Sequence, residues 1–310
     1  MQTIINLIYK SYNFINDKFS PISCKFLKVK SYNYKKLYIF SLHSTRVEHF
    51  KKYKYILKKI DDIAPFINPN NLNEFIDTNA INTNRSILTL DDGFKDNYSF
   101  AQTILKDLNI KAIFFVIPYF LFNNYQKEDF LKALYPKQEI DFTKISISDF
   151  QHLTIDQVYS LNEAGHIIGA HGFKHESATS LTLECLNKIT SQAKDDLSQI
   201  CQSLDHFCYP FGSKEYFNNY TNIILKNNFK FIHTGIRGSN SYKEWKSRIF
   251  KRHTISTHGK DLKYYPYSYE KIYFIVFNEL SRFPISLYKM IKKIYEFYLI
   301  VSKSISNIRF

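Results

Sequence analysis

Two rhythms of hydrophobic residues alternate along the chain. Short apolar runs predict buried strands at 37–42, 86–90, 111–117, 166–170, 206–209 and 230–235. Longer segments with apolar residues at helical spacing predict helices at 49–60, 97–109, 154–164, 182–204 and 214–227. Repeated strand–helix alternation is typical of a parallel sheet covered by helices. So many units over roughly 230 residues favour a (β/α) barrel, although the periodicity does not exclude an open sheet.

Local signals sharpen this pattern at two places. Thr154 and Gln157 have the spacing of a capping box, and Gly165 stands where a left-handed C-terminal cap belongs. Residues 119–149 carry scattered aromatic and charged residues that break the rhythm. We expect an inserted loop with a short helix there, near the mouth of the site.

The net charge of +14 is unevenly distributed. Residues 1–60 hold 13 Lys/Arg against 2 Asp/Glu, and residues 241–310 hold 14 against 5. The middle, residues 61–240, is acidic, with 15 against 21. A duplex-binding protein usually places a basic stripe on its working face, so nucleic acid is not the expected partner. The basic ends leave an anionic membrane surface open as a partner.

The four cysteines form no C-x-x-C pair, so neither a disulfide framework nor a cysteine-rich zinc site is expected. Buried, reduced thiols are the ordinary interpretation. The first residues lack a secretory pattern, and no uncharged apolar run reaches 18 residues. We therefore expect a cytoplasmic protein without a spanning helix, either free or peripherally bound to a membrane.

The first chemical motif is LTLDDGF, residues 88–94. A predicted strand runs directly into Asp91 and Asp92, and Gly93 lets the chain turn sharply. Active sites of parallel α/β folds collect at the carboxyl ends of strands. Two adjacent carboxylates repel each other unless a cation or a proton separates their roles. An ordinary Asp-Gly turn explains the motif about equally well when it is taken alone.

The second motif is GAHGFKHES, residues 169–177, and it also follows a predicted strand. His171 and His175 are four residues apart, so one helical turn would bring both to one face. Two imidazoles and a carboxylate suit a catalytic Zn²⁺ with open positions. The alternative is that both are ordinary surface histidines, and an H-x-x-x-H pattern taken alone favours this alternative.

The third motif is FCYPFG, residues 207–212. Pro210 has no N–H, but the backbone N–H of Tyr209 lies beside the predicted site, where it could stabilise an oxyanion. In isolation, a Pro-containing turn is the simpler interpretation.

In this order and spacing, the motifs resemble those of the polysaccharide deacetylase family, also called the NodB-homology domain or carbohydrate esterase family four. TLDDGF, HGFKH and YPFG look like its first three motifs, and the resemblance covers about residues 37–256. It implies a distorted (β/α) barrel and hydrolytic removal of an acetyl group from an N-acetylated sugar. It also implies a carbohydrate partner and one divalent metal ion, with Zn²⁺ expected and Co, Ni, Mn or Fe also suitable.

The resemblance assigns a role to each motif residue. Asp91 becomes the catalytic base, while Asp92, His171 and His175 become the metal ligands. The N–H of Tyr209 shares the oxyanion with the metal. His43, after the first strand, and Pro210 are expected to line the substrate pocket, although a structural role for His43 is equally compatible with its position.

The chain also departs from the family pattern. An arginine that orients the base is often present in the third motif, but Phe207 and Cys208 occupy that neighbourhood here, so the contact is missing or comes from elsewhere. Arg248 and Arg252 precede the last strand and are expected to be solvated. No Asp precedes Trp245, so the fourth motif is absent. His258 is taken as the general acid, with His253 and His233 as the other candidates.

We therefore expect three parts: a basic N-terminal extension (1–36), the barrel domain (37–260) and a basic, aromatic, amphipathic C-terminal segment (261–310). Within the last part, residues 285–301 place a narrow stripe of lysines on an apolar helix. Such a helix either packs on the barrel or lies in an anionic membrane surface. Three rival functions stay open: O-acetyl esterase, sugar deformylase and a non-catalytic carbohydrate-binding member.

Overall fold

The computed structural model describes residues 36–77, 83–136, 151–201 and 203–255. These residues belong to one compact unit, Tyr34–Tyr269. The predicted extensions, 1–36 and 261–310, lie almost wholly outside the described residues, as do segment 285–301 and His258. No helix in the described ranges is long and apolar enough to cross a membrane.

Eight strands form one parallel sheet, which confirms the predicted parallel arrangement. Their order is β7-β6-β5-β4-β3-β2-β1-β8, and every pairing is parallel. The strands are β1 (Leu37–Leu42), β2 (Arg85–Leu90), β3 (Ala112–Val116), β4 (Ile167–Ala170), β5 (His206–Cys208), β6 (Phe231–His233), β7 (Ile249–Phe250) and β8 (His253–Thr254).

The connection between β7 and β8 shows that the sheet curls. These two strands occupy opposite edges, yet only Lys251 and Arg252 separate them in the chain. A chain spans at most about 3.3–3.6 Å per residue, so the two edges must lie close together. Asn240 fills part of the gap: its backbone pairs with Leu37, and its side chain bonds to the backbone of Lys251. The result is an incomplete (β/α) barrel.

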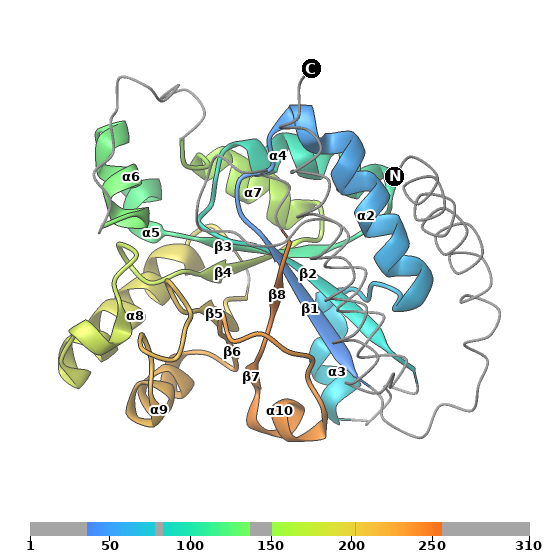
Figure 1. The fold of residues 1–310 in the computed structure, drawn as a ribbon. Coiled ribbons are helices and arrows are strands. Elements are labelled where there is room, and N and C mark those ends of the chain that lie inside the picture. The colour runs from blue at the N-terminus through green and yellow to red at the C-terminus, as the bar shows by residue number, and fades with distance from the viewer. Residues whose placement is uncertain (1–35, 78–82, 137–150, 202, 256–310) are drawn as a thin grey trace, which may run out of the picture. The chain divides into compact units, whose positions relative to one another are not determined.

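Helices surround the strands (Figure 1). They are α2 (Phe50–Ile63), α3 (Leu72–Asp77), α4 (Asp96–Phe100), α5 (Pro118–Phe122), α6 (Lys127–Leu134), α7 (Ile155–Glu163), α8 (Leu183–Ser198), α9 (Asn219–Asn228) and α10 (Tyr242–Ser247). Short turns η1 (Val47–His49), η2 (Pro69–Asn71) and η6 (Ala178–Ser180) connect some of them, and η3 (Ala101–Leu105) continues α4 as a π-helix.

Buried apolar side chains explain why the predicted strands form. All six residues of β1 and all five of β3 are buried. Alternate residues meet inside the barrel, where Ile39, Ile87, Phe115 and Phe250 belong to one apolar cluster. Such continuous hydrophobic runs are typical of parallel strands covered on both faces.

Capping residues set the helix ends. Thr154 and Gln157 form the predicted capping box at α7, and Gly165 has the predicted left-handed conformation, with φ 82°. The helix predicted at 214–227 starts only at Asn219, because the Asn218 side chain accepts hydrogen bonds from the backbone N–H groups of Tyr220 and Thr221. The helix predicted at 182–204 ends earlier, at Ser198.

Part of the predicted insertion is described, as α5 and α6. Their aromatic side chains form a second apolar cluster, whose buried members are Phe94, Ile117, Phe120, Phe130 and Leu134. This cluster includes Phe94, two residues after Asp92, so the insertion packs directly on the loop that carries the paired carboxylates.

Candidate active site

Three loops with polar side chains meet at one rim of the sheet. Asp91 and Asp92 directly follow β2, His171 follows β4, and Tyr209 follows β5. Because neighbouring strands are parallel, these loops leave the sheet at the same end.

Asp92, His171 and His175 direct toward one point three atoms that could bind a metal. Oδ1 of Asp92 lies 3.2 Å from Nε2 of His171 and 3.5 Å from Nε2 of His175. The three ligand atoms lie within 4.8 Å of one another, and all three residues are buried. Burial alone would raise the pKa of Asp92, but the adjacent imidazoles of His171 and His175 hold it well below its usual range. Asp92 is therefore ionised, as binding a metal would require.

Backbone carbonyl groups orient both imidazoles. Nδ1 of His171 lies 2.9 Å from the carbonyl oxygen of Cys208, and Nδ1 of His175 lies 2.9 Å from that of Ala133. A carbonyl can only accept, so each Nδ1 carries the proton and each Nε2 keeps its lone pair for a metal. The donor set and its tautomers fit a divalent ion such as Zn²⁺.

The expected helical turn from His171 to His175 is wrong. No helix covers these residues, and His175 has φ 65°, in the left-handed region. A Cβ on Gly172, whose φ is 71°, would lie 3.1 Å from Cγ of Pro210. The loop therefore turns tightly against the third motif, and this turn brings the two imidazole rings to 5.0 Å.

Asp91 is held by Arg252. Nη1 of Arg252 donates to Oδ1 of Asp91 at 2.7 Å, and Nη2 donates to Oδ2 at 2.8 Å. Burial alone would raise the pKa of Asp91, but the adjacent guanidinium outweighs it and lowers this pKa. Asp91 is thus a buried carboxylate kept ionised next to the metal-binding residues, as a general base requires.

The expectation that Arg252 is solvated is wrong, since the residue is only 4% exposed. Its remaining N–H groups donate to the carbonyl of Thr234, the hydroxyl of Thr89 and the sulfur of Cys208. Arg252 lies in the two-residue crossing from β7 to β8, which points it into the barrel. Arg248, by contrast, is partly exposed, and it bonds to Asn73 and Asp77.

Cys208 lies in the neighbourhood where the resemblance leads us to expect an arginine. Its thiol is buried, and this burial raises its pKa, so the sulfur accepts from Arg252 as a neutral thiol. The arginine contact that the third motif lacks therefore comes from the end of the barrel domain. Of the other cysteines, Cys201 is buried as expected, whereas Cys185 is exposed.

His43 lies at the edge of this arrangement. Its Nε2 is 3.9 Å from Oδ2 of Asp91, and its side chain is 28% exposed. Asn97 donates to the carbonyl oxygen of His43 at 2.8 Å, which fixes the loop after β1. His43 is therefore close to the base and open to a ligand.

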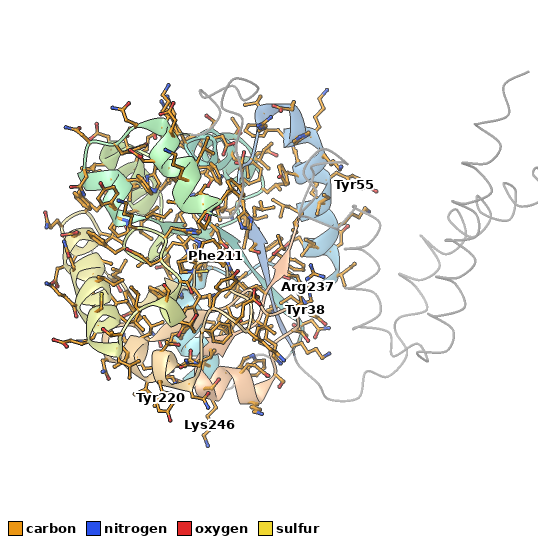
Figure 2. All side chains as sticks on the ribbon, turned by 60° about the vertical axis from the view of Figure 1, so that its left-hand side comes forward. Tyr38, Tyr55, Phe211, Tyr220, Arg237 and Lys246 are labelled. Atoms are coloured by element: carbon orange, nitrogen blue, oxygen red, sulfur yellow. The ribbon has the colours of Figure 1, made fainter. Side chains whose placement is uncertain are left out.

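The N–H of Tyr209 is already used within the sheet. It donates to the carbonyl oxygen of His233 at 3.0 Å, so an oxyanion could bind there only if this bond were given up. The next N–H along the chain is that of Phe211, whose φ is 61° and whose ring lies 4.6 Å from that of His175. Within the described ranges this N–H has no hydrogen-bond acceptor. Figure 2 labels Phe211.

Two of the three candidate acids, His233 and His253, are buried among other side chains. His233 is fully buried, and its Nε2 lies 3.1 Å from Nδ1 of His206. His253 is buried between β-strand residues, with its ring near those of Tyr38 and Phe40. Neither is placed to protonate a leaving group, and His258 lies outside the described residues.

The comparisons with known proteins agree with this geometry. Residues 79–232, about half of the chain, match the family model described as polysaccharide deacetylase. No curated protein matches the chain in sequence. Similar solved structures include the deacetylase PplD of Streptococcus pyogenes in complex with acetate, which is 20% identical, with a TM-score of 0.54 over 72% of this chain and 93% of that chain.

Two further structures show the same fold. IcaB from Ammonifex degensii is 15% identical, with a TM-score of 0.59 over 78% of this chain and 97% of that chain. A de-N-acetylase from Aggregatibacter actinomycetemcomitans is 15% identical, with a TM-score of 0.56 over 77% and 99%. The predicted distorted (β/α) barrel is thereby confirmed. The solved structures show that the chain shares this fold, and the family match places residues 79–232 in the polysaccharide deacetylase family.

Proposed function

We propose that this protein is a metal-dependent hydrolase that removes the acetyl group from an N-acetylated sugar in a glycan or a glycan precursor. One observation carries the proposal: two adjacent carboxylates have different partners. Asp92 faces two imidazole Nε2 atoms, while Asp91 is paired with a guanidinium. The different partners suit Asp92 to the role of metal ligand and the adjacent Asp91 to the role of base.

Asp92, His171 and His175 would hold the divalent metal. When bound, it supplies Lewis-acid polarisation of the acetyl carbonyl and makes a nearby water more acidic. Asp91 accepts a proton from the attacking water. Each carboxylate oxygen has two lone pairs, so the paired Arg252 leaves acceptor capacity on both oxygens of Asp91.

Breaking the carbon–nitrogen bond requires a proton on the departing amine. We assign this step to His43, because it is the partly exposed histidine beside the base. It replaces His258 in our interpretation. For the oxyanion, the N–H of Phe211 is better placed than that of Tyr209, because Tyr209 already donates to a carbonyl. Pro210 supports the loop between them by packing near Gly172.

The test is acetate release from N-acetylglucosamine oligosaccharides, compared between the wild type, Asp91→Asn and Asp92→Asn. Removal of a general base costs about 10²- to 10⁴-fold in rate. We expect Asp91→Asn to lose at least about a hundredfold in kcat while metal affinity changes little. Asp92→Asn should lose metal and activity together, because it removes a ligand.

Three outcomes would contradict the proposal. Near wild-type acetate release by Asp91→Asn would place the base elsewhere. Release of acetate from O-acetylated sugars only, or of formate from N-formyl sugars only, would move the reaction to the esterase or deformylase reading. No release from any acetylated or formylated sugar by the metal-loaded wild type would favour a binding module.

A further inference from the structure

A buried histidine outside the three motifs contacts the loop that carries the paired carboxylates. His152 lies just before α7 and is 3% exposed. Its ring fills the space beside Gly93: a Cβ built on Gly93 would lie 2.3 Å from Nε2 of His152. Gly93 directly follows Asp92, and both residues have positive φ, 65° and 70°. The ring therefore packs against the turn at its tightest point.

Both ring nitrogens of His152 have backbone partners. Nε2 accepts from the N–H of Ile117 at 3.2 Å, immediately after β3. Nδ1 lies 3.0 Å from the carbonyl oxygen of Leu153 and donates to it. A neutral imidazole with its proton on Nδ1 satisfies both contacts. A ring without an acceptor would leave the buried N–H of Ile117 unsatisfied.

The backbone around His152 also pairs with the turn. The N–H of Leu153 donates to the carbonyl oxygen of Gly93 at 2.8 Å, and the N–H of Lys95 donates to that of Gln151 at 2.7 Å. Phe94 and His152 face each other in an isolated antiparallel bridge. Backbone hydrogen bonds thus hold residues 93–95 against residues 151–153. Residues 93–95 directly follow Asp91 and Asp92 in the chain.

The aromatic cluster of α5 and α6 holds the ring from its outer side. The ring of Phe130 lies 5.6 Å and that of Phe120 6.2 Å from the His152 ring. The backbone N–H of His152 donates to the hydroxyl of Tyr125 at 3.2 Å. The ring is therefore held in one position by the turn at Gly93, the end of β3, α5 and α6.

We propose that His152 is a positioning residue, which holds the Asp91–Gly93 turn in the conformation that points Asp91 and Asp92 into the site. The proposal rests on the proposed function only in taking these two residues as base and ligand. Residues that orient metal ligands without touching the metal typically change metal affinity or activity by about 10- to 100-fold when replaced.

His166 provides a matched control. It is also buried, and its Nδ1 accepts from the N–H of Ala112 at 3.1 Å. Ala112 begins β3, whereas Ile117 follows its end. The two histidines therefore make the same kind of contact at opposite ends of one strand, and only His152 lies at the rim that carries the site.

The experiment compares His152→Phe, His152→Gln and His166→Phe. Phe keeps an aromatic ring but cannot accept from Ile117, whereas the amide oxygen of Gln reaches about as far as Nε2 and can accept. We measure Zn²⁺ affinity by competition with a chromophoric chelator, and amide hydrogen exchange of residues 91–95 in metal-free protein. His152→Phe should weaken Zn²⁺ binding at least about tenfold and speed exchange in the turn. His152→Gln should restore most of both, and His166→Phe should change neither.

Equal Zn²⁺ affinity and equal exchange in His152→Phe and wild type would overturn the inference. So would equal losses in His152→Phe and His166→Phe, because a loss shared by both ends of β3 is general destabilisation. If His152→Phe does not fold, His152→Asn replaces it, since Asn is too short to reach Ile117, and the contrast with Gln decides. A wild type that binds no Zn²⁺ contradicts the proposed function, while the exchange measurement still tests His152.

Discussion

Arg252 and Asp91 form a two-pronged ion pair although 161 residues separate them in the chain. Both partners are buried, and each nitrogen of the guanidinium has an acceptor. A planar guanidinium fixes both the position and the rotation of a carboxylate, which a lysine cannot do. Asp91, the proposed base, is therefore oriented by the residues between β7 and β8.

Replacing Arg252 should lower the free energy of unfolding, by an amount that depends on whether residue 91 is charged. Arg252→Met leaves a buried carboxylate without its partner, and breaking such a pair typically costs about 3–5 kcal/mol. In the double variant Arg252→Met/Asp91→Asn, no unpaired charge remains, so part of the loss in unfolding free energy should return. Urea denaturation of the two single variants and the double variant measures this coupling. Additive losses would show that the pair does not act as a unit.

Arg252→Lys separates orientation from charge. Lysine keeps a positive charge near Asp91 but cannot bind both oxygens, so kcat should fall while Zn²⁺ affinity stays near the wild-type value. A loss of about tenfold or more is expected, in line with other residues that orient catalytic groups. Unchanged kcat would mean that charge alone supports the base.

His43 should behave as a catalytic residue that does not bind metal. His43→Gln removes the proton donor beside Asp91 but leaves Asp92, His171 and His175 intact. Loss of general acid catalysis typically lowers the rate by about 10²- to 10⁴-fold. We expect kcat to fall in that range with Zn²⁺ affinity unchanged. His253→Gln is the control, because His253 is buried with its ring beside that of Phe40, and an equal loss of activity there would contradict the assignment.

The strands were predictable because both of their faces are buried. Residues 37–42 and 111–117 are continuous apolar runs, and such runs occur where helices cover a parallel sheet on both sides. The paired carboxylates and the two histidines were equally visible, since the motif that carries each pair directly follows a strand. These strands and motifs could be predicted because each depends on a short segment of the sequence.

Arg252 and His152 could not be predicted in this way. The role of Arg252 depends on barrel closure, which brings the crossing from β7 to β8 beside the end of β2. The role of His152 depends on a bridge between residues 151–153 and 93–95, more than 50 residues apart. In the sequence each is a single polar residue without a motif. The start of α9 also differs from the prediction, because Asn218 caps the helix and residues 214–217 lie outside it.

Membrane binding through residues 285–301 stays a prediction, since this segment lies outside the described residues. It follows from the lysine stripe and the basic ends of the chain. Full-length protein should sediment with anionic liposomes, and binding should weaken with salt because ions screen the attraction to headgroups. A chain truncated after Arg282 should bind less. Equal sedimentation of both proteins would contradict membrane binding by this segment and favour a helix packed on the barrel.

Buried neutral histidines should make the barrel sensitive to mild acid. Burial is the main cause that lowers the pKa of His166 to about 4 and that of His206 to about 3. The unfolded chain takes up these protons near pH 6.5, before the folded protein does. Stability is therefore full above pH 6.5 and falls as the pH drops from 6.5 toward 4, by up to about 3 kcal/mol for His166.

The window between pH 6.5 and 5 isolates this effect, because Asp and Glu of the unfolded chain take up protons mainly below it. His166→Asn removes the titration but keeps an acceptor for the N–H of Ala112, which now bonds to the imidazole. Urea denaturation at pH 7.5, 6.5 and 5.0 should show a smaller fall in unfolding free energy for His166→Asn than for the wild type. The variant should be less stable at pH 7.5 but lose less on acidification. An identical fall in both proteins would mean that His166 does not contribute to the acid sensitivity of the fold.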